Sequence, residues 1–83
     1  NKYNIIGYKI KLNDYNIKFK SLFKTYTYYY KNIYRIAFNK NILNIFMVLN
    51  NTYTKKQFRF NNSNKCFNFF VCFKNKFNSI YSI

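Results

Sequence analysis

Acidic residues are almost absent from this 83-residue sequence. Asp14 is the single acid against fifteen lysines and arginines, so the formal net charge is +14. The chain also has no histidine and no proline, and its one glycine is Gly7. One carboxylate side chain and no imidazole cannot form an acid–base pair, a catalytic triad or a metal cage. We therefore expect no enzyme activity, no metal, no cofactor and no small-molecule substrate.

Long apolar runs are lacking as well. The longest run, Ile45 to Leu49, has five residues, far fewer than the roughly 20 that cross a bilayer as a helix. We therefore expect no membrane partner. The two cysteines, Cys66 and Cys72, are too few for an ordinary zinc site. A buried pair of free thiols is expected rather than a disulfide.

Positive charge is what the sequence has instead, and it extends along the whole chain. The length fits one domain, residues 1–83. Fourteen uncompensated charges repel one another and weaken a compact state, so we expect a negative partner. The cations are interleaved with 10 tyrosines and 11 phenylalanines, whereas disordered basic arms are poor in aromatic residues. The sequence therefore predicts a folded domain that binds a polyanion.

Part of this composition is typical of a protein encoded by an A/T-rich gene. Asn, Lys, Ile, Tyr and Phe fill 60 of the 83 positions, and all five are encoded by A/T-rich codons. The codons GAA and GAT of the acids are A/T-rich too, so nucleotide bias does not explain the shortage of acids. An organellar or similarly A/T-biased genome is the expected source, and an A/T-rich organelle is the expected location.

The order of apolar residues predicts the elements. Residues 8–12 alternate apolar and basic side chains, which is typical of a half-buried strand. Seven apolar residues then follow helical spacing: Phe19, Leu22, Phe23, Tyr26, Tyr30, Ile33 and Tyr34. Residues 33–38 and 42–49 predict a hairpin with the basic tip Asn39-Lys40-Asn41. Residues 50–56 are expected to form a polar loop, residues 58–60 an extended run and residues 66–73 a strand.

Together these elements predict an α+β sandwich with helices on one face of an antiparallel sheet. The alternative is an all-β barrel, in which Asn13-Asp14 is a hairpin turn and residues 15–30 are strands.

Two blocks of the sequence share a pattern with one protein family. Residues 10–16 match I-R-L-K-A-Y-D at Ile10, Leu12 and Tyr15. Residues 46–60 match F-T-V-L-R-S-P-H-x-x-K-K-S-R-E-Q-F-E-I at Phe46, Val48-Leu49, Lys55-Lys56 and, after a gap of about three residues where the S-R-E is missing, Gln57-Phe58. The chain thus resembles ribosomal protein S ten of the small subunit, in a shortened mitochondrial form, over about residues 8–70. The S-P-H and the prolines of that family are missing here.

This resemblance implies a split β-α-β (ferredoxin-like) sandwich with a long protruding hairpin. It also implies a structural role in the small ribosomal subunit of the mitochondrial matrix, where the chain would stabilise head-domain ribosomal RNA beside ribosomal proteins S three, S nine and S fourteen. The expected RNA-binding residues are Lys9, Lys11, Arg35, Lys40, Lys55, Lys56, Arg59 and Lys65. The alternatives are another or lineage-specific organellar ribosomal protein, and a small accessory subunit of a respiratory membrane complex.

Alternation and ring content add two local expectations. Arg59 lies between Phe58 and Phe60, so a strand here turns Arg59 outward and the two rings inward. Aromatic side chains that remain exposed could stack on unpaired bases. The candidates are Tyr53, Tyr81 and one of Tyr28 or Tyr29.

Overall fold

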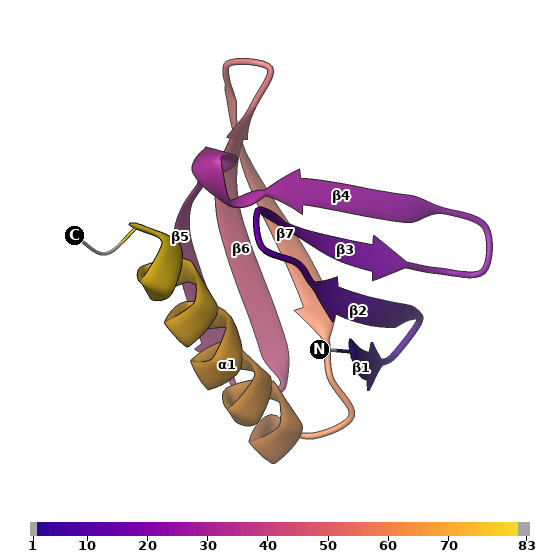
Figure 1. Cartoon of the computed structure of the whole chain (residues 1–83). Coiled ribbons are helices and arrows are strands. Elements are labelled where there is room, and N and C mark those ends of the chain that lie inside the picture. The colour runs from indigo at the N-terminus through magenta and orange to yellow at the C-terminus, as the bar shows by residue number, and fades with distance from the viewer. Residues whose placement is uncertain (1, 82–83) are drawn as a thin grey trace.

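A computed structural model describes residues 2–81, and the side chains of residues 2–79. Over these residues the chain forms seven strands, a short 3-10 helix and one α-helix (Figure 1). Their bounds are β1 (Lys2–Ile5), β2 (Tyr8–Leu12), β3 (Asn16–Lys20), β4 (Thr25–Tyr29), η1 (Tyr30–Asn32), β5 (Ile33–Asn39), β6 (Ile42–Leu49), β7 (Thr52–Arg59) and α1 (Ser63–Tyr81). The strands form two antiparallel sheets, β1-β2-β3-β4 and β5-β6-β7, in which each strand pairs with its neighbours in sequence.

Asparagine provides turns in a chain that is poor in glycine. Asn50 and Asn51, between β6 and β7, have φ angles of 51° and 63°. A two-residue hairpin loop with both residues at positive φ matches the right-handed twist of the flanking strands. Asparagine tolerates this left-handed backbone better than most residues, so the hairpin forms without glycine. In the β1–β2 turn, the positive φ of 84° is that of Gly7.

The two sheets pack face to face and their strands cross at a steep angle (Figure 1). Alternation turns Ile10, Ile17 and Phe19 of the first sheet inward, where they are fully buried. The second sheet buries Leu43, Ile45 and Met47 against them. The rings of Phe19 and Phe58 stack across the interface, with centroids 3.7 Å apart and planes 6° apart. This stacked pair joins the two sheets within the core.

Helix α1 covers the part of the second sheet that the first sheet leaves open, beside β5 and β6 (Figure 1). Its first turn is capped by Asn62, whose Oδ1 accepts a hydrogen bond of 2.8 Å from the Lys65 backbone N–H. Cys66, Phe69 and Phe73 form its buried stripe, and the Tyr3 ring of β1 packs edge-on against Phe69 at 4.8 Å. The helix therefore ties the end of the chain to its first strand.

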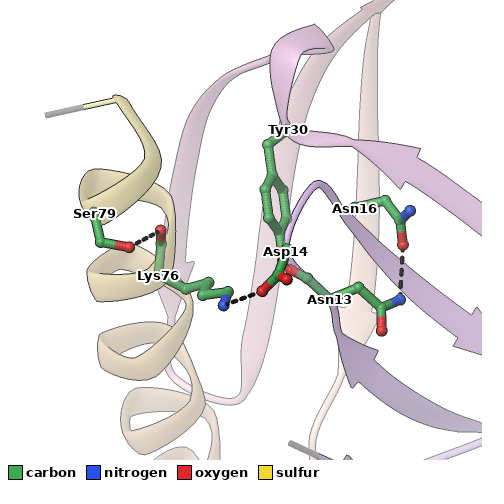
Figure 2. A network of polar contacts seen from close by, with 6 residues as sticks. All are labelled: Asn13, Asp14, Asn16, Tyr30, Lys76 and Ser79. Atoms are coloured by element: carbon green, nitrogen blue, oxygen red, sulfur yellow. Dashed lines mark hydrogen bonds and ion pairs between the residues drawn. The ribbon is translucent and has the colours of Figure 1, made fainter.

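The β2–β3 turn is held to η1 and α1 by polar contacts (Figure 2). The Asp14 carboxylate forms an ion pair with Lys76 of α1, with 2.9 Å between Oδ1 and Nζ. The buried Tyr30 hydroxyl donates a 2.7 Å hydrogen bond to the Asn13 carbonyl. Burial, aided by the negative charge of Asp14, raises the pKa of Tyr30 to about 12. The turn is thus fixed from two sides.

The predicted split β-α-β fold is wrong. The structure is mostly β, with helices at η1 and α1 among the described residues. The barrel alternative placed strands correctly between residues 15 and 30, but the two sheets do not close into a barrel over residues 2–81. The strand over residues 8–12 is confirmed as β2, and the hairpin over residues 33–49 is confirmed as β5 and β6.

The helix expected over residues 19–34 is replaced by β3, β4 and η1. Its apolar stripe included Leu22 and Phe23, which lie in the β3–β4 turn with 87% and 91% of their surfaces exposed. The alternation of buried Ile17 and Phe19 with exposed Lys18 and Lys20 is the stronger signal. Thr25 to Tyr28 adds the strand preference of threonine and tyrosine.

Two further assignments are corrected. Residues 66–73 are part of α1 and not a strand, because an apolar run of this length fits a buried strand and a helix equally well. Residues 50–56 are mostly strand: β7 begins at Thr52 and pairs with β6 along its whole length. Cys66 and Cys72 are free thiols, as expected, but Cys72 is exposed.

Candidate nucleic-acid interface

Five lysines share the outer face of the first sheet, which we call the lysine face. Alternation turns the residues between them into the core, so all five side chains are exposed. The members are Lys2 of β1, Lys9 and Lys11 of β2, and Lys18 and Lys20 of β3.

The strand register brings these lysines directly opposite one another. Lys11 faces Lys2 on one side and Lys18 on the other, and Lys9 faces Lys20. Residues paired in this way have Cβ atoms about 4.5–5.5 Å apart, and like charges at such positions destabilise a sheet. The lysine face therefore lowers the stability of the unbound protein. A bound anion would restore that stability by screening the repulsion.

The lysine face is concave. A hollow of about 590 Å³ lies over it, lined by all five lysines together with Asn4, Ile10 and Thr25. The amide of Asn4 and the hydroxyl of Thr25 add polar groups between the cations. The surface can therefore surround an anionic chain on more than one side.

No carboxylate side chain of the sequence neutralises this face. Asp14 is the single acidic residue of the sequence, and it pairs with Lys76 where the β2–β3 turn faces α1 (Figure 2). The five lysines consequently lack an internal acidic partner, and their charge is available to a ligand.

The eight predicted RNA-binding residues do not form one surface. Lys9 and Lys11 belong to the lysine face. Arg35, Lys55 and Arg59 point outward from the second sheet. Lys40 is exposed at the tip of the β5–β6 hairpin, and Lys65 is exposed in the first turn of α1. Lys56 is half-buried and pairs with the buried Ile45, so it points to the inner side of β7.

Sequence reasoning missed Lys2, Lys18 and Lys20. The last two lie at the start of a segment interpreted as helical, which hid their place beside Lys9 and Lys11. The signal that identifies them is the alternation with Ile17 and Phe19. Once that segment is interpreted as a strand, the turn at Asn13-Asp14 places β3 beside β2.

Several exposure predictions are confirmed. Arg59 is exposed between Phe58 and Phe60, which are 6% and 2% exposed. Tyr53 is 78% exposed, and of the neighbouring pair Tyr28 is buried whereas Tyr29 is 48% exposed. The side chain of Tyr81 lies outside the described residues.

Metal-ligand clusters and helices suited to span a membrane are absent from the described part of the chain. Within it, no group of three or more His, Cys, Asp or Glu residues could hold a metal ion. No helix between residues 2 and 81 is long and apolar enough to span a membrane. Comparison with known proteins finds no family, no curated relative and no solved structure that matches the chain.

Proposed function

We propose that the chain binds RNA through the lysine face and serves as a structural constituent of the mitochondrial small ribosomal subunit, with ribosomal RNA as its ligand. The observation that carries the proposal is the set of five lysines in facing positions over one hollow. Each phosphate that a lysine neutralises releases a condensed counterion, which provides affinity independent of base sequence.

The layout of the lysines favours a chain of phosphates over a single one. Lys9 and Lys11 are two residues apart on one strand, as are Lys18 and Lys20 on the next. Two residues of a strand span about 6.5–7 Å, and adjacent strands lie about 5 Å apart. One phosphate would engage one or two of these lysines, whereas a phosphodiester backbone engages several at once.

The ribosomal part of the proposal is supported by composition. A net charge of +14 on 83 residues, with one acid, suits a protein surrounded by RNA, and the excess of amino acids with A/T-rich codons suits an organellar gene. The resemblance to the S-ten family gives no support, because the fold that it implies is absent. That resemblance and the neighbouring ribosomal proteins that it implies stay predictions.

A matched pair of double variants tests the binding surface. Lys11→Gln/Lys18→Gln removes two facing charges of the lysine face, and Lys31→Gln/Lys74→Gln removes two exposed charges outside it. At ~0.1 M salt the first variant should bind a duplex RNA hairpin roughly 30- to 100-fold more weakly. Its slope of log K against log salt should fall by about 1.5–2. Equal losses in the two variants would show that total charge, and not the lysine face, determines binding.

The ribosomal assignment has its own test. The native protein should sediment with small ribosomal subunits in an organelle lysate, and ribonuclease should release it. Sedimentation with membranes after ribonuclease treatment would reject the assignment.

A second candidate function is binding to an anionic membrane surface. Leu22 and Phe23 at the β3–β4 turn are almost fully exposed, and Lys20 and Lys24 flank the turn. Clustered lysines beside an apolar tip attract anionic headgroups and insert into the interface. RNA is favoured because Arg35, Lys55 and Arg59 lie on the other sheet, where a membrane that contacts the lysine face cannot reach them.

Leu22→Ser/Phe23→Ser separates the two candidates. The substituted side chains are exposed, so the fold should be unchanged. RNA affinity should stay within about twofold of the natural chain, because no phosphate contact is lost. If the variant instead loses binding to vesicles that contain anionic lipid, and the natural chain prefers these vesicles to RNA in competition, the membrane function is the correct one.

A further inference from the structure

The outer face of the second sheet has a different chemistry from the lysine face. We call it the arginine–aromatic face, and its members are Tyr34, Arg35, Phe46, Tyr53, Lys55 and Arg59. Both arginines of the sequence lie here, although lysine outnumbers arginine 13 to 2. The inner faces of the two sheets form the common core, so this face and the lysine face look to opposite sides of the sandwich.

A β-bulge near the start of β5 places two consecutive side chains on this face. The register of β5 against β6 shifts between Ile33 and Arg35, and the extra residue is Tyr34. Bulges of this kind redirect a side chain locally. The Tyr34 ring accordingly contacts Phe46 and Tyr53 of the outer face, at 6.2 Å and 5.7 Å between centroids.

Cations flank the central ring. Arg35 and Lys55 occupy the positions on either side of Phe46 in the register of the three strands. The Arg35 guanidinium lies 5.3 Å from the Phe46 ring centroid. Tyr34 is 55% exposed and Tyr53 is 78% exposed, so both rings present open π-surface beside fixed positive charge.

From this arrangement we infer that the arginine–aromatic face binds an unpaired stretch of RNA by stacking its bases on Tyr34 and Tyr53. Arg35 and Lys55 would hold the adjoining phosphates. The inference rests on the proposed function and extends it: the protein bridges a paired RNA segment on the lysine face and an unpaired segment on the opposite face. Every base has a π-surface, so this site tolerates any sequence.

Charge favours RNA over a protein as the occupant. Arg35, Lys55 and Arg59 are exposed, and the one carboxylate side chain of the sequence is paired with Lys76 elsewhere. A ligand of this face must therefore bring both negative charge and flat apolar surface. Unpaired nucleotides combine the two in every residue, and an arginine fork can bridge phosphate oxygens or stack on a base.

The test uses the full chain and two RNA probes, a blunt duplex hairpin and an unstructured single strand of about eight nucleotides. Tyr53→Ala removes an exposed stacking ring, and Tyr15→Ala is the matched control because Tyr15 is 75% exposed in the β2–β3 turn. Tyr53→Ala should weaken single-strand binding by about 5- to 100-fold and leave duplex binding within about twofold. Tyr53→Phe should retain single-strand affinity, since stacking needs the ring and not the hydroxyl.

The variant of the lysine face, Lys11→Gln/Lys18→Gln, should show the converse pattern, with a larger loss for the duplex than for the single strand. Immobilised duplex should also capture labelled single strand through the protein, which requires two separate faces. If the lysine variant weakens duplex binding but Tyr53→Ala leaves both probes unchanged, the stacking site is refuted and the proposed function stands. If the lysine variant changes neither probe, the proposed function itself fails.

Discussion

The two outer faces of the sandwich are produced by the same strand alternation, yet they differ in what opposes each cation. On the lysine face, Lys11 lies between Lys2 and Lys18, so cation faces cation. On the arginine–aromatic face, Arg35 and Lys55 face Phe46. Facing like charges weaken a sheet, whereas cation–ring pairs stabilise it slightly. The first face therefore gains stability from a bound anion, and the second is stable without one.

The difference also concerns the kind of cation. Lysine is a strongly hydrated point charge on a flexible stem, whereas the planar guanidinium of arginine stacks on rings and forms paired hydrogen bonds. All five cations of the lysine face are lysines, which suits a backbone of phosphates in varied positions. Arg35 lies beside the Phe46 ring and near the exposed ring of Tyr34, which suits flat bases.

The largest effect is expected from the core that both faces share. Phe58→Ala removes one ring of the stacked pair that joins the sheets, and loss of a buried phenylalanine costs about 3–5 kcal/mol. A domain this small has a marginal total stability, so affinity for duplex and single-strand RNA should be lost together, with unfolding visible by circular dichroism. Phe23→Ala, at an exposed ring, is the control. Loss of one RNA affinity alone would mean that the faces are supported independently.

A smaller effect is expected at the junction between the sheets. Tyr30→Phe deletes the hydrogen bond to the Asn13 carbonyl and should lower the free energy of unfolding by about 1 kcal/mol. Burial raises the pKa of Tyr30 from 10.0 to about 12. The stability linked to its neutral hydroxyl is therefore complete below pH 10 and is lost as the pH rises toward 12.

Urea titrations at several alkaline pH values check this prediction. Tyr30→Phe should flatten the loss of stability over that pH window, and Tyr15→Phe, at an exposed tyrosine, should not. An unchanged alkaline profile in Tyr30→Phe would assign the loss to other groups.

Charge reversal directly probes the contrast between the faces. Lys18→Glu converts the facing pair with Lys11 from repulsion to attraction, and should raise the free energy of unfolding by about 0.5–1 kcal/mol. Lys55→Glu makes the same charge change opposite Phe46, where no repulsion is relieved within the pair. In urea denaturation at low salt, the increase in the free energy of unfolding for Lys55→Glu should be less than half of that for Lys18→Glu. Equal gains would mean that net charge alone matters and that the facing lysines carry no special cost.

The smallest effect is expected away from both faces. Asp14→Asn removes the ion pair with Lys76, in which the Asp14 side chain is 83% exposed and that of Lys76 35%, and ion pairs open to solvent in this way contribute only a few tenths of a kcal/mol. The melting temperature should fall slightly, and the affinities for duplex and single-strand RNA should stay the same. A loss of duplex affinity would show that the turn at Asp14 positions the lysine face.

The elements that could be predicted from the sequence are those whose pattern of apolar residues fits a strand and not a helix. Strand β2 alternates strictly, and the β5–β6 hairpin has long apolar arms on either side of an asparagine-rich tip, so both were found. Residues 66–73 are apolar on nearly every side, and such a run does not distinguish strand from helix. The helix signal that was available is the capping asparagine, Asn62, which the many asparagines of the chain concealed.

The candidate site was predictable only in part, for a related reason. Lys9 and Lys11 were found because they alternate within a recognised strand. Whether Lys18 and Lys20 join them depends on the pairing of β3 with β2. Strand pairing is a tertiary contact, and it could not be predicted once the β3 segment was assigned to a helix. Exposure of Arg59 followed from local alternation alone. The position of Tyr34 depends on a bulge, which no local pattern indicates.

The simple order of the strands has a consequence for how the protein is made. Each strand pairs with the one synthesised just before it within its sheet, and chains rich in such local contacts fold quickly. The first sheet is complete at Tyr29, while the rest of the chain is still being translated at about 5–20 residues per second. All the strands that carry the lysine face are thus synthesised before β5, β6, β7 and α1. Helix α1, which packs Phe69 against Tyr3 of β1, follows all seven strands in this sequence, so an anion can meet the lysines before the helix packs on the sheets.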